Sequence, residues 1–168
     1  MPTPKREAIF AALATKLGAH RARADIDQRD LPARVLWSGE DGELERTRYG
    51  DISVSTGATL IAQHPADADH DKWDGQGNAI MAQIIADATG GDRTLGGLAD
   101  DLTYTTTAIL YPDAGSNIIT VGVDLAIRWS HPLGNPYIPS TDNPALYASV
   151  DGAVYINSNG RAWAQAAA

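Results

Sequence analysis

The stretch of sequence that decides the fold runs from Asp92 to Trp129 and opens with a glycine-containing turn, Asp92-Arg93-Thr94-Leu95-Gly96-Gly97-Leu98. Two runs that alternate apolar and polar residues follow this turn. In the second run the odd positions are all apolar: Ile119, Val121, Val123, Leu125, Ile127 and Trp129. Because successive side chains of a strand point to opposite faces, the run predicts a long strand with one buried face.

The first run predicts the partner strand of a hairpin. Its alternation puts Leu102, Tyr104, Thr106, Ala108 and Leu110 on one face, and on the other an outward row that contains Thr103, Thr105 and Thr107. Residues 112–117, between the two runs, are turn formers. We therefore expect a long antiparallel hairpin whose tip lies at 112–117.

The first part of the chain predicts a helix and a strand. Thr3 is a candidate cap, Pro4 a candidate first helical residue and Gly18 a candidate terminator, and the apolar face between them consists of Ile9, Ala12, Leu13 and Leu17. Residues 20–30 indicate a charged surface connection. Residues 31–37 then predict a strand, and residues 39–43 a polar loop.

A second strand and a second helix are expected between this loop and the glycine turn. Apolar residues take most even positions between Ile52 and Ala62, which predicts a half-buried strand with a bulge at Gly57. Asp67 or Asp69 can cap the helix that follows. Its apolar face consists of Trp73, Gly77, Ile80, Ile84 and Ala88.

This order of elements predicts an α+β domain over residues 1–130, with a mainly antiparallel sheet of about four strands and two helices packed on one face. Residues 131–168 are expected to add a proline-rich linker and a small C-terminal β-ribbon. In that ribbon residues 146–150 and 153–157 flank Asp151-Gly152, the preferred dipeptide of a two-residue hairpin.

Composition limits the class of protein. The 168 residues suffice for one domain with an appendage, contain no cysteine and carry a formal net charge of −8. Residues 1–48 hold nine Lys and Arg against eight Asp and Glu, whereas residues 49–168 hold four against thirteen. This balance argues against tight nucleic-acid binding. No apolar run approaches the roughly 20 residues that cross a bilayer, and the first residues lack the apolar stretch of a secretory signal, so we expect a soluble protein made in the cytoplasm.

Two segments have residue types that could support chemistry. The glycines at 90–97 could suggest a phosphate site, but they follow a helix and precede a strand, so a structural turn capped by Asp92 or Thr94 is favoured. The second segment is a metal-ligand cluster, His64, Asp67, Asp69, His70 and Asp71. Its spacing matches no familiar site, and an acid-rich helix start is the favoured interpretation. We expect no catalytic residue, no cofactor and no metal.

The order of elements, together with Leu31-Pro32-Ala33 and the run from Asp92 to Ala99, resembles the tail terminator proteins of long-tailed bacteriophages, also called tail completion or minor tail proteins. The resemblance covers about residues 4–130, and its most distinctive part is the run from Arg93 to Leu98. It implies a homo-oligomeric ring, usually of six copies, at the head-proximal end of the virion tail.

Such a ring ends growth of the tail tube, and its partners are the tail tube protein and the head–tail connector or neck protein. DNA passes through its lumen without specific binding, and no membrane is involved. Two alternatives remain open: a head-side neck or closure protein of the same connector, and a metal-binding protein that uses the cluster from His64 to Asp71.

The resemblance also directs attention to subunit and tube contacts. Subunit contacts are expected from the outward row Thr103, Thr105 and Thr107. Tube contacts are expected from the loops at residues 39–48 and 113–117, with these candidate residues: Arg46, Arg48, Asp113 and Asn117.

Overall fold

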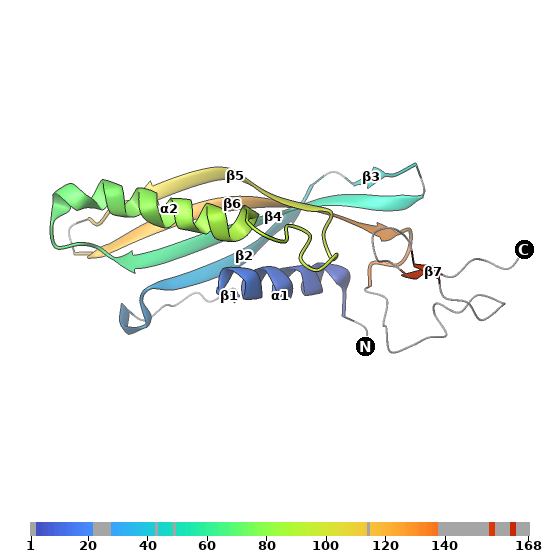
Figure 1. Cartoon of the computed structure of the whole chain (residues 1–168), viewed down its shortest axis with the longest axis horizontal. Helices are drawn as coiled ribbons and strands as arrows, with labels where there is room; N and C mark the ends of the chain where they lie inside the picture. The colour runs from blue at the N-terminus through green and yellow to red at the C-terminus, as the bar shows by residue number, and fades with distance from the viewer. Residues whose placement is uncertain are drawn as a thin grey trace, which may run out of the picture.

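The computed structural model describes residues 3–21, 28–42, 44–48, 50–113, 115–137, 155–156 and 162–163. These residues form an α+β fold with two α-helices and an open, mixed sheet of six strands (Figure 1). The helices are α1 (Lys5–Leu17) and α2 (Trp73–Thr89), and short 3₁₀ turns lie at Gln28–Asp30 and His70–Lys72. The α+β class predicted from the sequence is therefore confirmed.

The sheet has the strand order β1-β2-β4-β6-β5, and β3 pairs with β4 off this path. Its strands are β1 (His20–Arg21), β2 (Ala33–Asp41), β3 (Glu45–Arg46), β4 (Asp51–Pro65), β5 (Asp101–Leu110) and β6 (Ile118–Pro132). β1 runs parallel to β2, and the other pairs are antiparallel. The sequence predicted about four strands because β1 and β3, with two residues each, are too short to produce a hydrophobic period.

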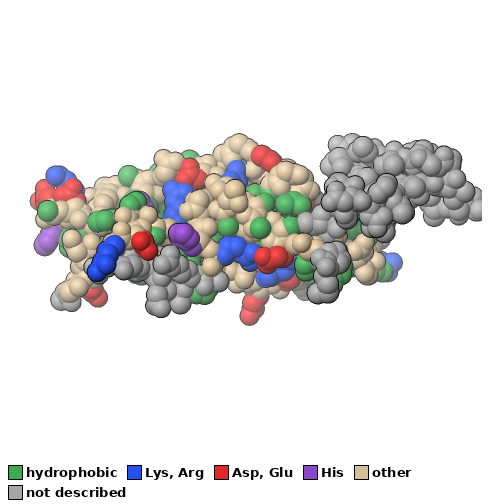
Figure 2. Space-filling model, turned by 90° about the horizontal axis from the view of Figure 1, so that it is seen from below, with side chains coloured by type: hydrophobic (Ala, Val, Ile, Leu, Met, Phe, Trp, Pro, Cys, Tyr) green, Lys and Arg blue, Asp and Glu red, His purple; other side chains and the backbone are tan. Residues whose placement is uncertain are grey.

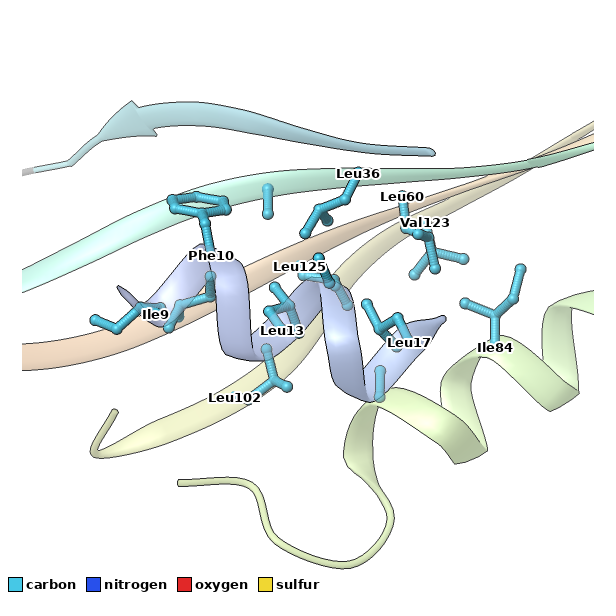
Figure 3. Close-up of a cluster of buried hydrophobic side chains, with 14 of the residues drawn as sticks. Ile9, Phe10, Leu13, Leu17, Leu36, Leu60, Ile84, Leu102, Val123 and Leu125 are labelled. Atoms are coloured by element: carbon cyan, nitrogen blue, oxygen red, sulfur yellow. The ribbon is translucent and has the colours of Figure 1, made fainter. Parts of the chain in front are cut away.

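The core lies between one face of the sheet and the two helices (Figure 3). The odd positions of β6 from Ile119 to Trp129 are all buried, as their alternation predicted. Helix α1 contributes Ile9, Phe10, Leu13 and Leu17, and α2 contributes Ile84 and Ala88. The predicted helix faces are thus confirmed, with Phe10 as an addition.

The hairpin of β5 and β6 has the predicted antiparallel pairing but not the predicted alternation. The register shifts between Tyr104 and Thr106, so Thr105 is an extra residue in β5. Before this bulge Thr103 faces away from the helices, whereas Thr107 beyond it is paired with buried Val123 and shares its face. The prediction of one outward threonine row is therefore wrong, because one extra residue reverses every later side chain.

The bulge predicted in β4 lies instead in its neighbour. β2 continues to Asp41, through residues predicted to form a polar loop, and its register with β4 shifts between Ser38 and Asp41. A Cβ at Gly39 would lie 2.8 Å from the carbonyl oxygen of Gly57. The backbones of β2 and β4 approach closely at Gly57, but the one extra residue belongs to β2.

Both ends of α1 have clear local causes. Gly18 ends the helix in the left-handed conformation, with φ at 58°, as its position predicted. Helix α1 begins at Lys5 rather than Pro4. The capping position is therefore Pro4, which makes no side-chain capping hydrogen bond, and the predicted cap at Thr3 is wrong. The backbone N–H of Lys5 instead donates to the carbonyl of Pro136, 2.8 Å away.

The end of β6 is joined to the start of α1. Besides the Lys5–Pro136 bond, Pro4 and Tyr137 form an isolated bridge. The predicted hairpin over residues 146–157 lies almost wholly outside the described residues. What is described there is a different antiparallel pairing, between β7 (Tyr155–Ile156) and β8 (Ala162–Trp163).

Candidate functional site

The turn at residues 92–98 is held together by the side chain of Asp92. One carboxylate oxygen accepts hydrogen bonds from the backbone N–H of Thr94 (2.8 Å) and from its hydroxyl (2.6 Å). The other accepts from the N–H of Gly96, 2.6 Å away. The Thr94 hydroxyl, followed by the backbone N–H groups of Gly96 and Thr94, holds the pKa of Asp92 below its usual value. An anion would need the same N–H groups, so this geometry favours a structural turn over a phosphate site.

The glycine turn also connects three elements. Lys16 of α1 donates from Nζ to the carbonyls of Gly90 (2.7 Å) and Asp92 (2.9 Å). Arg93 binds Asp101 of β5 at 2.6 Å and donates from Nε to the carbonyl of Leu102. Leu95, 7% exposed, belongs to the core cluster despite a φ of 53°. The turn therefore positions β5 relative to α1. Asp92 and Lys16 line an open hollow of about 480 Å³ beside it, but both side chains are engaged in the hydrogen bonds of the turn.

The candidate metal cluster forms the connection between β4 and α2. Asp67 accepts from the N–H of Asp69 (2.9 Å), and Asp69 accepts from the N–H of Asp71 (3.2 Å), which caps the 3₁₀ turn. The indole N–H of Trp73 donates to the carbonyl of Asp67. Across the part of the chain that the structure describes, no three His, Asp or Glu side chains are grouped closely enough to hold a metal ion. The geometry is that of an acid-rich helix start.

The loop candidates Arg46 and Arg48 lie at the end of the sheet that contains β3. Arg46 is paired with Ile52 of β4, and both arginines are exposed. This end also has the exposed carboxylates of Glu40 and Glu45, so its charge is mixed. We call it the β3 end; Figure 1 places it opposite the start of α2.

The other loop candidates, Asp113 and Asn117, lie at the opposite end, which we call the tip end. Their loop follows β5, and the carbonyl of Asn117 accepts from the N–H of Ala66. Tyr111 donates to Asp74 of α2 at 2.6 Å, which anchors the tip to that helix. Exposed aspartates gather at this end: Asp67, Asp69, Asp71, Asp74 and Asp113.

The two loops expected to contact the tube are far apart. In the pairing of β4 with β6, Asp51 lies opposite Pro132 at the β3 end, and Pro65 lies opposite Ile118 at the tip end. Fourteen residue steps at about 3.3 Å each separate these ends by about 46 Å. One flat partner surface perpendicular to the strands therefore cannot contact both loops, so the two loops stay separate candidates for tube contact.

A chain of polar contacts runs from the core to the surface near the β3 end, and the sequence did not predict it. The Trp129 indole N–H donates to the Thr56 hydroxyl (2.8 Å), and this hydroxyl donates to Asp41 (2.7 Å). Arg6 of α1 binds Asp41 at 3.0 Å and donates to the carbonyl of Gly39. The available signal was Thr56 itself, a polar residue on the apolar face of β4. Its role is to fasten α1 to the bulged end of β2.

The surface seen in Figure 2 has acidic and basic side chains interspersed, without a broad Lys and Arg patch on its described part. None of the described helices combines the length and the apolar character that a membrane crossing requires. No protein-family model matches this sequence, and no curated protein matches it either.

Proposed function

We propose that this chain is a structural virion protein of the tail terminator class. In this proposal six copies form a ring on the last disc of the tail tube, stop tube polymerisation and provide the surface that joins the head connector. The protein acts through its interfaces and not through catalysis. The resemblance of residues 4–130 supports the class, and the open α+β sheet is compatible with it.

The observation that carries the proposal is the distance and chemical difference between the two ends of the sheet. The β3 end has mixed charge with two exposed arginines, and the tip end has five exposed aspartates against one lysine, Lys72. Because the ends are about 46 Å apart, each can contact a different partner. An adapter between a tube and a connector needs such a pair of surfaces.

The sheet also has surfaces suited to contacts between copies. Both helices pack on one face, and the opposite face presents small or polar side chains along β4 and β6, among them Thr59, Gly122, Asp124 and Ala126. Thr59 donates to Asp124 across these strands at 2.7 Å, so this face is ordered before any partner binds. A preformed face lowers the entropic cost of assembly.

The acidic excess has a proposed use in the ring. Carboxylates at the tip end would line the lumen and repel DNA, so that DNA passes without adhering. Replacing Asp69, Asp71 and Asp113 by asparagine should then slow DNA passage. Unchanged kinetics of DNA ejection from particles that contain the variant would contradict this assignment.

Immunogold electron microscopy of lysates from producing cells tests the proposed location. Antibody against the chain should label one end of free tails as well as the head–tail junction of complete particles. Labelling of filled heads without tails would favour the alternative, a head-side neck or closure protein. Labelling of neither assembly would contradict both.

A further inference from the structure

Strand β5 is the last strand of the sheet, and within the described residues it pairs only with β6. We call the side of β5 that faces away from β6 the β5 edge. Arg93 Nε donates to the carbonyl of Leu102, which is a side-chain substitute for one missing ladder bond. Further along the strand, the hydroxyl of Thr103 donates a long bond of 3.4 Å to the carbonyl of Tyr104. Backbone N–H and C=O groups on such an edge form a template for another strand.

The β5 edge lacks most of the features that keep natural edge strands apart. Residues 102–111 contain no charged residue and no proline. Four of them are threonines and one is isoleucine, types that favour extended backbone. The bulge at Thr105 is the one protective irregularity in this run. A strand that must stay unpaired would ordinarily have a lysine or proline in so long a stretch.

Exposed apolar side chains gather along the same strand. Seven large hydrophobic side chains are exposed among the described residues, and three lie on or directly after β5: Tyr104 at 44%, Leu110 at 65% and Tyr111 at 44%. A strand added to the β5 edge would cover part of these side chains. Burial of apolar surface and formation of backbone hydrogen bonds with β5 would therefore both favour the added strand.

The opposite edge of the sheet is already occupied. β1 pairs with β2 at Val35 and Leu36, and Arg6 donates to the carbonyl of Gly39 at 2.6 Å. Direct pairing of the β5 edge with β2 of a second copy would have to displace these contacts. The strand that occupies the β5 edge is therefore expected from another part of the chain.

The chain has a segment of suitable length and composition beyond Tyr137. Residues 146–157 are rich in apolar and β-forming types and contain one charge, at Asp151. The last described residue before this segment is Tyr137, which is bridged to Pro4. Nine residue steps join Tyr137 to Leu146 and span up to about 30 Å. This is enough to reach a neighbour in contact with the β3 end, close to where β5 begins.

We propose that the segment of residues 146–157 of one copy adds one of its strands to the β5 edge of the neighbouring copy. The turn at Asp151-Gly152 divides the segment, and β7 keeps its pairing with β8. This inference rests on the proposed ring. Each copy offers one edge and one segment, so a head-to-tail order fills every edge only when the ring closes. The segment thereby limits assembly to a closed ring, because an open chain of copies retains an exposed β5 edge.

Photocrosslinking in the full chain tests this inference. Tyr104 is replaced by p-benzoylphenylalanine, and equal amounts of ¹⁴N- and ¹⁵N-labelled protein are unfolded together and refolded before irradiation. Mass spectrometry should then find position 104 linked to residues 146–157, with about half of the linked peptide pairs of mixed isotope. The matched control places the photoreactive residue at Trp37 on β2, which is also exposed and should not link to this segment.

Three results would overturn the inference: linked pairs of one isotope only, which would mean that each copy covers its own edge; links from position 104 to other segments; or no link. The mass of the same uncrosslinked samples separates this inference from the proposed function. A closed oligomer without the 104-to-146–157 link removes the inference and leaves the ring. A monomer without mixed links removes both.

Discussion

Asp92 stabilises its own turn through three hydrogen bonds, from the N–H and the hydroxyl of Thr94 and from the N–H of Gly96. Lys16 connects this turn to α1, and Arg93 connects it to β5. One exposed carboxylate thus determines where the principal hairpin begins.

The ionised form of Asp92 should make stability depend on pH. The hydrogen bonds from Thr94 and Gly96 lower the folded-state pKa of Asp92, whereas its pKa in the unfolded chain is about 3.9. A group with a depressed folded-state pKa stabilises the fold above its unfolded pKa, and this contribution is lost as the pH falls through the folded-state value. Asp92→Asn should therefore lower the melting temperature at pH 7, and the difference from the natural protein should shrink below pH 4. Circular dichroism melts at both pH values check this, and an equal difference at both would contradict it.

Thr56 is fully buried, and its hydroxyl links the indole of Trp129 to the carboxylate of Asp41. Thr56→Val keeps the shape but leaves the indole N–H without an acceptor, which should cost about 1–3 kcal/mol of unfolding free energy. The matched control is Thr120→Val on the outer face of β6, expected to change stability by less than about 0.5 kcal/mol. Urea unfolding at one fixed protein concentration measures both. Equal effects of the two substitutions would show that the buried bond contributes nothing.

At the residue scale, the alternation of apolar and polar residues predicted which side chains of the strands are buried. It did not predict where a bulge interrupts the alternation. The face of β6 follows directly from its odd apolar positions, and the helix end at Gly18 follows from its glycine. The bulge at Thr105 could not be predicted, because threonines precede and follow it and either register leaves polar residues outside. The same ambiguity hid the position of the bulge opposite Gly57.

At the element scale, α2 lies so close to β5 that a glycine is needed at one point. A Cβ at Gly77 would lie 2.8 Å from Cγ2 of Ile109, whereas a Cβ at Gly75 would meet nothing within 4 Å. The two positions are two residues apart in the same helix, and both are poor in helix propensity. They therefore separate the effect of packing from the effect of propensity.

Gly75→Ala should stabilise the protein by up to about 1 kcal/mol, because alanine favours the helix and meets open space. Gly77→Ala gains the same propensity but pushes Ile109 and β5, and overpacking costs about 1–3 kcal/mol, so the net effect should be destabilising. Denaturant unfolding of both variants provides the measurement. If Gly77→Ala were as stabilising as Gly75→Ala, the close packing of α2 on β5 would be wrong.

Element lengths explain what sequence patterns could and could not predict at this scale. β4 and β6, with 15 residues each, produce long periods that are easily read. The two-residue strands β1 and β3 produce none, and they appear because neighbouring backbone brings them to β2 and β4. The extension of β2 through Gly39 to Asp41 was missed because glycine and acidic residues usually indicate a loop.

At the scale of the whole molecule, the length of the sheet determines which candidate residues can act together. Arg46 and Arg48 lie at the β3 end, and Asp113 and Asn117 lie at the tip end about 46 Å away. A sequence pattern places residues along the chain and says little about distances between loops. The distance between the two ends could be found only from the register of β4 with β6.

The two ends should act independently in binding. Under the proposed function we assign the β3 end to the tail tube, so Arg46→Glu with Arg48→Glu should reduce co-sedimentation with purified tail tubes at least tenfold while ring formation persists. The matched variant at the other end, Asp69→Asn with Asp71→Asn, should bind tubes normally. Normal tube binding by the arginine variant, or loss in the aspartate variant, would contradict this assignment.

The central claim is that the full chain forms a closed ring. Native mass spectrometry together with negative-stain imaging of the purified protein, over a range of concentrations, tests it most directly. The predicted result is one dominant species with six times the 17.8 kDa chain mass and hollow particles of uniform diameter. A chain that stays monomeric at every concentration, or that forms open filaments of variable length, would contradict the claim.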